Sequence, residues 1–214
     1  MTLKAMVACA ALMIAGGAAQ ASTLSEDFNN GMLNGFGVIN VGSGSIVNGG
    51  PGGDTDPYLN VVDDGSGFMA VTFGPSWVGD LSAFDGATFS VDYIQTEQAA
   101  GGYIESFGTL LLTGAGRTIG ADVIGPDPIA SWQSASAVLD AALFGVTQEI
   151  WEEVLADITE FNMRAESWSN PSETVGFDNF LLVGAMPPAV PLPAGGVLLL
   201  TGLGAFALTR RRKR

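Results

Sequence analysis

Carboxylates are the main side chains available for chemistry in this 214-residue chain. The sequence has 22 Asp and Glu residues, no His and a single cysteine, Cys9. Without His, a Ser-His-Asp or Cys-His catalytic arrangement is excluded, as is any His ligand for a metal. A lone cysteine forms no intrachain disulfide and no thiolate metal cluster. What remains is carboxylate chemistry, either acid–base catalysis or binding of a hard cation.

Catalysis by carboxylates would require two carboxyl groups that face a sugar at a set separation. Neighbouring acids such as Asp63-Asp64 and Glu152-Glu153 are present, but a chain with this many acids contains such pairs by chance. The sequence has no G-x-S-x-G and no P-loop motif. We therefore expect a protein that is not an enzyme and keep a carboxylate-based glycan hydrolase as the alternative.

Positive charge is confined almost entirely to the two ends. Lys4 lies near the start and five cations occupy 210–214, so only Arg117 and Arg164 lie among the acids of the central part. Two cations cannot build a phosphate clamp, and the acidic body would repel nucleic acid. Hydrophobic residues make up 47% of the chain, enough to bury a core, which distinguishes it from a disordered acidic chain.

The N-terminus has the pattern of a secretory signal. An apolar run over 5–15 is followed by the small-x-small sequence Ala19-Gln20-Ala21. The run is shorter than the roughly 20 apolar residues that a membrane-spanning helix needs. We therefore predict a signal peptide that is cleaved between Ala21 and Ser22, with the Sec export system and signal peptidase as partners.

The C-terminus carries a second targeting pattern. A Pro-rich linker from 187 leads into Val190-Pro191-Leu192-Pro193-Ala194, an apolar run over 195–208 and the five terminal cations. The positive-inside rule would keep these cations in the cytoplasm. This three-part tail resembles the PEP-CTERM class of bacterial sorting tails. The resemblance implies processing by exosortase, a membrane protease; a plain membrane anchor is the alternative.

These ends divide the chain into three parts. We predict a signal peptide over 1–21, a folded body over 22–186, and a sorting or anchor segment over 187–214 that contains the motif, a transmembrane run and a basic stop. The predicted location is secreted or cell-surface, with the C-terminal helix as a transient anchor in the inner membrane.

The body alternates short strand-like runs with Gly-rich turns. Turn signals occur at 42–45, 48–53, 63–67 and 101–102. Over 88–93, Phe89, Val91 and Tyr93 alternate with polar residues, as in a strand with one buried face. Similar runs lie at 108–113, 161–165 and 176–183. Many short strands with such turns favour a β-sandwich.

One helix is predicted within this β pattern. Apolar residues recur at helical spacing from Val146 to Ile158. Thr147 is a suitable N-cap. The acidic residues that follow it lie in the first turns, where the positive end of the helix dipole stabilises negative charge. We expect this helix to close one end of the core and to bury Trp151 there.

Several landmarks follow one another in order along the body. They are a Gly-rich turn at 49–53, Asp63-Asp64-Gly65, Gly79-Asp80 with Ser82, a strand at 86–91, Trp132, Met163-Arg164-Ala165 and Gly176-Phe177-Asp178-Asn179. This order resembles the laminin B (laminin IV) domain over 45–183, with Phe177 where that family usually has Leu and without its cysteines. The resemblance implies a jelly-roll β-sandwich, similar to galactose-binding and carbohydrate-binding modules, that serves in extracellular matrix and adhesion.

The jelly-roll resemblance also implies a role for particular carboxylates. Sandwiches of the carbohydrate-binding type often hold a structural Ca²⁺ between an early carboxylate and a late Asp. The matching residues here are Glu26, Asp27 and Asp178, and carboxylate and carbonyl oxygens are the ligands that Ca²⁺ prefers. The alternative is that these acids cap turns and face solvent.

Sugar binding would require an exposed aromatic ring. Trp168 lies in a polar stretch at 166–171 and is the aromatic residue that we expect to be exposed. The other tryptophans and the tyrosines lie in patterned segments and are expected in the core. We therefore predict an exported, non-catalytic matrix or adhesion component that could bind extracellular polysaccharide. A structural envelope protein without a specific ligand is a further alternative.

Overall fold

The structure is a computed structural model, and it describes residues 21–40, 42–65, 67–97, 107–124, 131–166 and 173–185. All of these lie in one compact unit, Ala21–Ala185. Residues 1–20 of the predicted signal peptide (1–21), the segment over 187–214 and Trp168 lie outside the described residues. Within the described ranges, no helix has the length and apolar character needed to cross a membrane.

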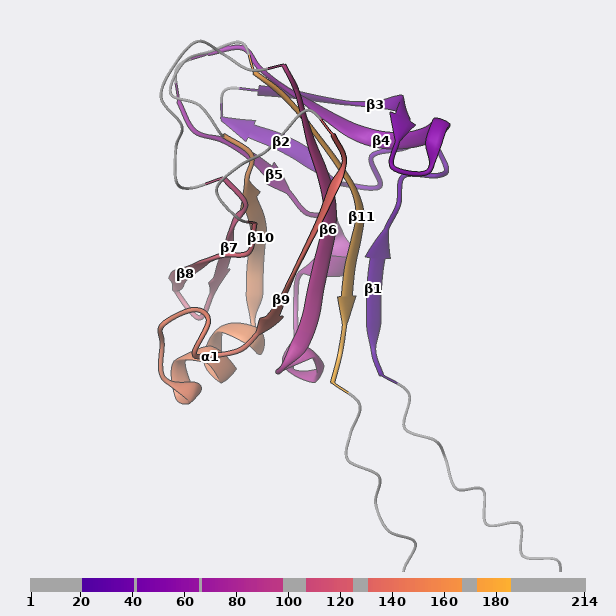
Figure 1. The fold of residues 1–214 in the computed structure, drawn as a ribbon. Helices are drawn as coiled ribbons and strands as arrows, with labels where there is room; N and C mark the ends of the chain where they lie inside the picture. The colour runs from indigo at the N-terminus through magenta and orange to yellow at the C-terminus, as the bar shows by residue number, and fades with distance from the viewer. Residues whose placement is uncertain are drawn as a thin grey trace, which may run out of the picture. The chain divides into compact units, whose positions relative to one another are not determined.

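Two antiparallel sheets form the body (Figure 1). Sheet A has the order β3-β4-β11-β6-β9, and β1 pairs with the second half of β11. Its strands are β1 (Thr23–Glu26), β3 (Gly42–Gly50), β4 (Gly53–Asp63), β6 (Ala87–Glu97), β9 (Gln133–Leu139) and β11 (Thr174–Val183). Sheet B has the order β2-β5-β10-β7-β8. Its strands are β2 (Gly37–Asn40), β5 (Met69–Thr72), β7 (Thr109–Gly114), β8 (Arg117–Asp122) and β10 (Ile158–Arg164).

The core lies between the two sheets and follows from the alternation of side chains along each strand. In β6, Phe89, Val91 and Tyr93 are buried, whereas the polar residues between them point to the other face. In β10, Phe161 and Met163 enter the same core from sheet B. Aromatic rings meet at its centre, with the Phe73 and Phe161 centroids 4.6 Å apart. The predicted mainly β, jelly-roll sandwich is confirmed.

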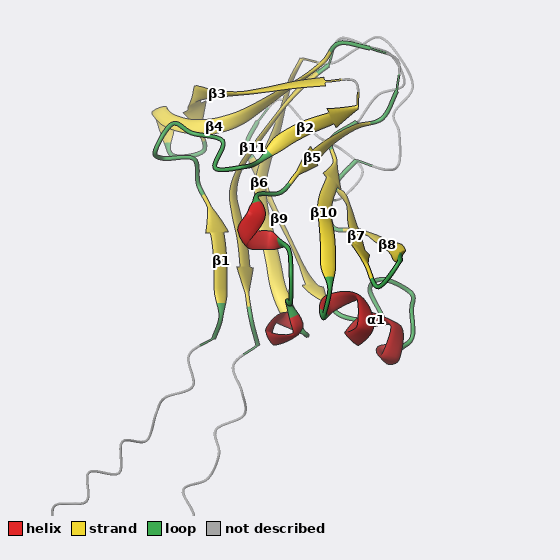
Figure 2. Cartoon of the chain, turned by 180° about the vertical axis from the view of Figure 1, so that it is seen from behind, coloured by secondary structure: helices red, strands yellow, loops and turns green. Residues whose placement is uncertain are grey.

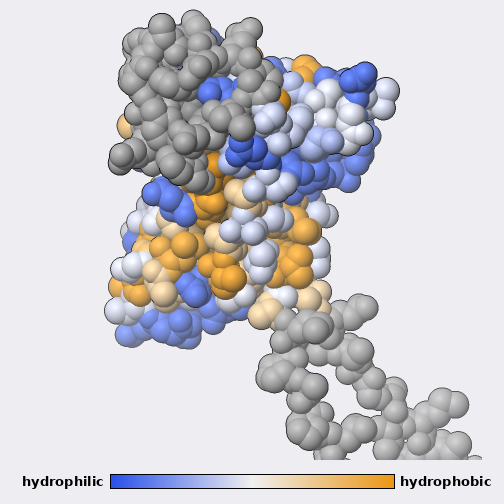
Figure 3. Space-filling view, in the orientation of Figure 1, coloured by the Kyte–Doolittle hydropathy of each residue, from blue (hydrophilic) through white to orange (hydrophobic). Residues whose placement is uncertain are grey.

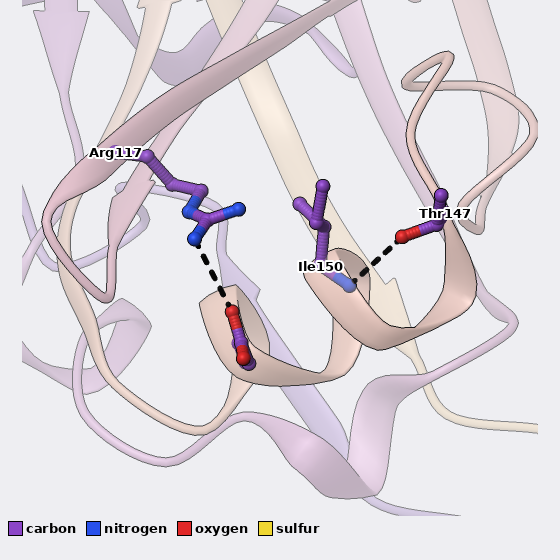
Figure 4. A network of polar contacts seen from close by, with 4 residues as sticks. Arg117, Thr147 and Ile150 are labelled. Atoms are coloured by element: carbon purple, nitrogen blue, oxygen red, sulfur yellow. Dashed lines mark hydrogen bonds and ion pairs between the residues drawn. The ribbon is translucent and has the colours of Figure 1, made fainter.

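The predicted helix is present as α1 (Gln148–Leu155), next to sheet B at one end of the sandwich (Figure 2). Thr147 caps it as expected: its side-chain oxygen accepts a hydrogen bond from the Ile150 amide at 3.3 Å. Trp151 is fully buried, as predicted. Figure 4 shows this cap together with the exposed ion pair between Arg117 Nη2 and Glu153 Oε2, 3.4 Å long, which links β8 to the helix.

The two ends of the described unit lie side by side. Thr23 of β1 pairs with Val183 of β11, and the Gly184 amide donates to the Ser22 carbonyl at 2.8 Å. The first residue of the predicted mature chain, Ser22, therefore lies beside the point from which the C-terminal segment continues.

Candidate functional site

The outer face of sheet B presents an exposed aromatic ring beside a cation. Phe68 immediately precedes β5 and is 51% exposed. The Arg164 guanidinium, at the end of β10, lies 4.5 Å from the centre of the Phe68 ring. A cation over an aromatic face is attracted by the ring quadrupole, so each side chain holds the other in place. One planar cation and one flat apolar ring are thus fixed together at the surface.

Polar side chains continue this face across the neighbouring strands. Asn162 lies between the core residues Phe161 and Met163, so its side chain points to the outer face. It is opposite Thr72 on one side and Leu111 on the other. Its Nδ2 contacts Glu160 Oε2 at the hydrogen-bond limit of 3.5 Å, and its buried Oδ1 has no hydrogen-bond partner.

The edge of sheet B adds one more polar pair. Thr109 of β7 donates a side-chain hydrogen bond to Asp122 of β8, directly opposite it. We call the set Phe68, Thr72, Thr109, Asp122, Glu160, Asn162 and Arg164 the sheet B face. It combines one exposed aromatic ring with several hydrogen-bond donors and acceptors. A ligand that has both a flat apolar surface and polar groups could stack on the ring and be oriented by these donors and acceptors.

Sheet A carries a second aromatic pair, on its own outer face. Tyr58 of β4 and Trp132 meet edge to face with centroids 5.1 Å apart, and the Trp132 indole donates to the Gly49 carbonyl at 3.1 Å. Tyr58 covers Gly176, where an added Cβ would lie 2.6 Å from Tyr58 Cε2. Tyr58 is buried as expected, but Trp132 is only half-buried because it flanks the edge strand β9.

Asp178 is the most unusual carboxylate among the described residues of sheet A. It is 1% exposed and its Oδ1 has no hydrogen-bond partner. Burial raises the pKa of Asp178 to about 7, helped by the negative charges of Asp56, Asp27 and Asp92 and opposed by the Asn179 amide. A carboxylate with an unsatisfied buried oxygen requires a proton or a cation for stability.

Asp178 belongs to a polar row that crosses three strands. Asp92 of β6 is directly opposite Asp178, and Ser134 of β9 is opposite Asp92. Ser134 donates to Asp92 Oδ1, and Asn179 Nδ2 donates to Asp92 Oδ2 at 2.8 Å. Asp92 is therefore hydrogen-bonded on both oxygens, unlike Asp178.

The sequence-predicted calcium residues are brought together only in part. Asp27 is close enough to Asp178 to raise its pKa. The Glu26 carboxylate is instead bonded to the Phe28 amide and to Asn34 Nδ2, each at 2.9 Å from Oε1. Over the described ranges, no three His, Cys, Asp or Glu side chains are grouped so that they could hold a metal ion.

A calcium ion at Asp178 would thus take few carboxylate ligands. Its unpartnered Oδ1 and the nearby Asp27 carboxylate fit a hard cation. Backbone carbonyls and water would have to complete the coordination, because Ca²⁺ takes six to eight oxygens.

Sequence reasoning missed the Phe68–Arg164 pair. Two signals were available: Phe68 follows a Gly-rich turn, and Arg164 is one of only two cations in the body. Trp168, the aromatic residue that was expected to be exposed, lies outside the described residues. The predicted processing residues Val190, Pro191, Leu192, Pro193 and Ala194 lie outside them as well.

Comparison with protein-family models and with curated proteins found no match. Solved structures do resemble the fold. An exo-β-agarase matches 76% of this chain with a TM-score of 0.55 and 18% identity, although the match spans only 24% of the agarase chain. The CBM22-2 xylan-binding domain of Paenibacillus barcinonensis Xyn10C matches 76% of this chain and 99% of its own, with a TM-score of 0.51 and 15% identity.

The human laminin α-2 L4b domain is also similar, over 55% of this chain and 70% of the laminin domain, with a TM-score of 0.44 and 14% identity. That score is too low to establish a shared fold, so the laminin B resemblance of the sequence stays a prediction. At these identities, the agarase and xylan-binding structures define the class of fold, a carbohydrate-binding-module-like sandwich, and nothing narrower.

Proposed function

We propose that this chain is an exported, non-catalytic protein that binds extracellular polysaccharide through the sheet B face. It would reach the cell surface by its signal peptide and be processed at its C-terminal tail by an exosortase-type protease. The observation that carries the binding proposal is the Phe68 ring, 51% exposed and held by Arg164. A sugar ring presents flat C–H surfaces to an aromatic side chain, and its hydroxyls take hydrogen bonds from neighbouring polar groups.

The polar groups of the sheet B face support this assignment. Arg164 supplies donors, and the exposed side chains of Glu160 and Asp122 supply acceptors. By contrast, Figure 3 shows apolar side chains gathered over the lower half of the face of sheet A. Val138, in strand β9 of sheet A, is 51% exposed, and its side chain offers no hydrogen bond. The name of one similar structure, a xylan-binding domain, agrees with a polysaccharide ligand.

A non-catalytic role is favoured by where the perturbed carboxyl groups lie. Glycoside hydrolysis needs two carboxyl groups that face the bound sugar. Among the described residues, the carboxyl groups of Asp178 and Glu166 have pKa values raised to about 7, and these side chains are only 1% and 4% exposed. Neither is available to a sugar lying on the sheet B face.

A glycan array probed with the purified protein tests this proposal. We expect binding to one class of polysaccharide and no release of reducing ends from it. Retention without hydrolysis supports the proposal, hydrolysis would favour the glycan hydrolase, and absence of binding to every glycan would favour a structural envelope protein.

We also propose that a structural Ca²⁺ binds at Asp178 with Asp27 and Glu26, which requires Glu26 to exchange its bond to Asn34. An ion that binds only the folded protein stabilises it by RT ln(1 + [Ca²⁺]/Kd), about 2.7 kcal/mol at a hundredfold excess over Kd. For a body of this size, the melting temperature would rise by roughly 5 to 10 °C. Mg²⁺ should stabilise less, because it dehydrates reluctantly.

Thermal melts of the wild type and Asp178→Asn in EDTA, Ca²⁺ or Mg²⁺ test the calcium site. Because the pKa of Asp178 is raised when folded, its ionisation destabilises the protein above about pH 7 when no cation is bound. Asp178→Asn should therefore melt higher than the wild type in EDTA at pH 8 and should not respond to Ca²⁺. A full calcium shift in this variant, or none in the wild type, would exclude the site.

A further inference from the structure

The guanidinium of Arg164 has no anionic partner among the described residues. The folded body contains all 22 Asp and Glu residues of the chain but only two cations, Arg117 and Arg164. Arg117 is paired with Glu153. The Arg164 side chain, by contrast, forms no ion pair or hydrogen bond over the described ranges and contacts only the Phe68 ring. Its N–H donors are therefore available to a ligand.

The acids that precede and follow Arg164 along the chain are bonded elsewhere. Glu160, earlier in the same strand, contacts Asn162 Nδ2 through Oε2 at 3.5 Å. Glu166, just after the strand, is 4% exposed and accepts from the Met69 amide at 3.2 Å through Oε2. An arginine that remains unpaired in so acidic a protein is positioned for an anion from outside.

Apolar side chains lie on one side of this guanidinium. Ala70 of β5 is directly opposite Arg164, and Ile39 of β2 is directly opposite Ala70. Ile39 is 38% exposed and Phe68 is 51% exposed, whereas the small Ala70 side chain is buried between these strands. This side of Arg164 offers an uncharged surface on which a neutral sugar ring could pack.

A negative charge lies on the other side. The Gly108 amide donates to the Arg164 carbonyl at 2.9 Å, so the start of β7 lies beside Arg164. Thr109, the next residue, donates to the exposed carboxylate of Asp122 in β8. Arg164 is thus a single positive position between an apolar surface and an acid. One carboxylate fits there, but a second one on the β8 side would meet Asp122.

The overall negative charge of the body does not exclude one bound carboxylate. Charges at the surface are screened over about 8 Å at physiological ionic strength, so distant acids act weakly on a group held at Arg164. A chain with a charge on every sugar differs, because its next carboxylates would lie close to Asp122 or Glu160. The face therefore distinguishes an isolated carboxylate from a continuous polyanion.

We propose that the sheet B face recognises a polysaccharide whose repeat carries one carboxylate, as in a single uronate, between neutral sugars. Arg164 binds this carboxylate through two N–H groups while a neutral ring packs against Phe68. A guanidinium is planar, matches a carboxylate with two parallel hydrogen bonds, and does so while it contacts an aromatic ring. This inference rests on the proposed polysaccharide binding and specifies the class of polysaccharide.

An array of matched polymers, probed with the purified full chain, tests this class. It holds gellan and glucuronoxylan, which carry isolated uronates, each beside the same polymer after reduction of its carboxyl groups to alcohols, and polygalacturonate as a continuous polyanion. The wild type should bind a native polymer about tenfold more tightly than its carboxyl-reduced form, because a charge-assisted hydrogen-bond pair is lost. Polygalacturonate should bind more weakly than that native polymer.

Variants assign this preference to Arg164. Arg164→Gln should bind the native polymer only as tightly as the wild type binds the reduced form, and its affinity for the reduced form should be unchanged. Arg117→Gln is the matched control, because it removes the same charge from a cation that is paired with Glu153. Arg117→Gln should bind both forms as the wild type does.

The outcomes separate this inference from the proposed function. Equal or tighter binding of the carboxyl-reduced forms, tightest binding of polygalacturonate, or an equal loss for both forms in Arg164→Gln would overturn carboxylate recognition and leave polysaccharide binding in place. Absence of binding to every polymer would overturn both. The comparison of native with reduced polymer uses the wild type alone, so it decides the question even if Arg164→Gln fails to fold.

Discussion

At the scale of single residues, a side-chain hydrogen bond to Asp85 fixes the buried indole of Trp151. Trp151 is fully buried, stacks on Phe144 with centroids 5.0 Å apart, and donates from Nε1 to Asp85 Oδ1 at 2.7 Å. Asp85 also accepts from Gln148 Nε2 at 3.1 Å. The indole therefore joins helix α1 to the turn before β6, while its ring fills the end of the core.

Trp151→Phe should lower the free energy of unfolding by about 1 to 2 kcal/mol, since it keeps an aromatic ring but removes the donor to Asp85. Urea denaturation measures the change. Trp132→Phe is the matched control, because that indole bonds to Gly49 at an exposed edge and its loss should cost less. If the free energy of unfolding fell equally in the two variants, the bond to Asp85 would contribute no more to stability than the exposed bond to Gly49.

Buried aromatic residues were easier to predict from the sequence than exposed ones. Trp77 and Trp151 lie in patterned segments, and both are fully buried. Phe68 was not predicted as exposed, because its surroundings depend on Arg164, which is distant in sequence and adjacent only through the pairing of β5 with β10. Periodicity describes a residue's own segment and not the segment that packs beside it.

Among the elements, strands with a regular alternation were predicted well. The expected strands at 88–93 and 176–183 lie within β6 and β11. The bulge in β11 between Asp178 and Leu181, with Asn179 at φ 51°, was not predicted. It places Asp178 on the outer face and Phe180 in the core, and a strict period of two cannot describe both.

The cap of helix α1 gives a prediction at this scale. Thr147→Ala should reduce the free energy of unfolding by about 1 kcal/mol, because the Ile150 amide loses its side-chain acceptor. Chemical denaturation provides the measurement. Thr147→Ser keeps the hydroxyl and should stay close to the wild type; if Ser and Ala were equally destabilising, the cap would not be the cause.

At the largest scale, the two ends of the described unit are adjacent. Because Ser22 and Gly184 are hydrogen-bonded, cleavage after Ala21 would leave the new N-terminus beside the strand from which the tail continues. Neither the cleavage nor the tail follows from the fold; both rest on the sequence patterns at the two ends. The fold class followed from strand spacing, whereas the sheet pairing that builds the candidate sites joins residues too distant for local patterns to connect.

Mass spectrometry of the protein from its native host tests the proposed processing. We expect a mature N-terminus at Ser22 and loss of the residues beyond Pro193, because the motif precedes a short apolar run with an abrupt basic end. Recovery of surface-located protein that still ends at Arg214 would favour a plain membrane anchor.

The central functional claim is that polysaccharide binds at the sheet B face. Titration calorimetry with the polysaccharide identified on the glycan array tests this claim. Phe68→Ala should weaken binding about tenfold or more, since an exposed ring at the centre of a contact commonly contributes over 1.4 kcal/mol. Val138→Ala, which removes an equally exposed apolar side chain from sheet A, should bind as the wild type does. Unchanged affinity in Phe68→Ala, or an equal loss in Val138→Ala, would contradict binding at the sheet B face.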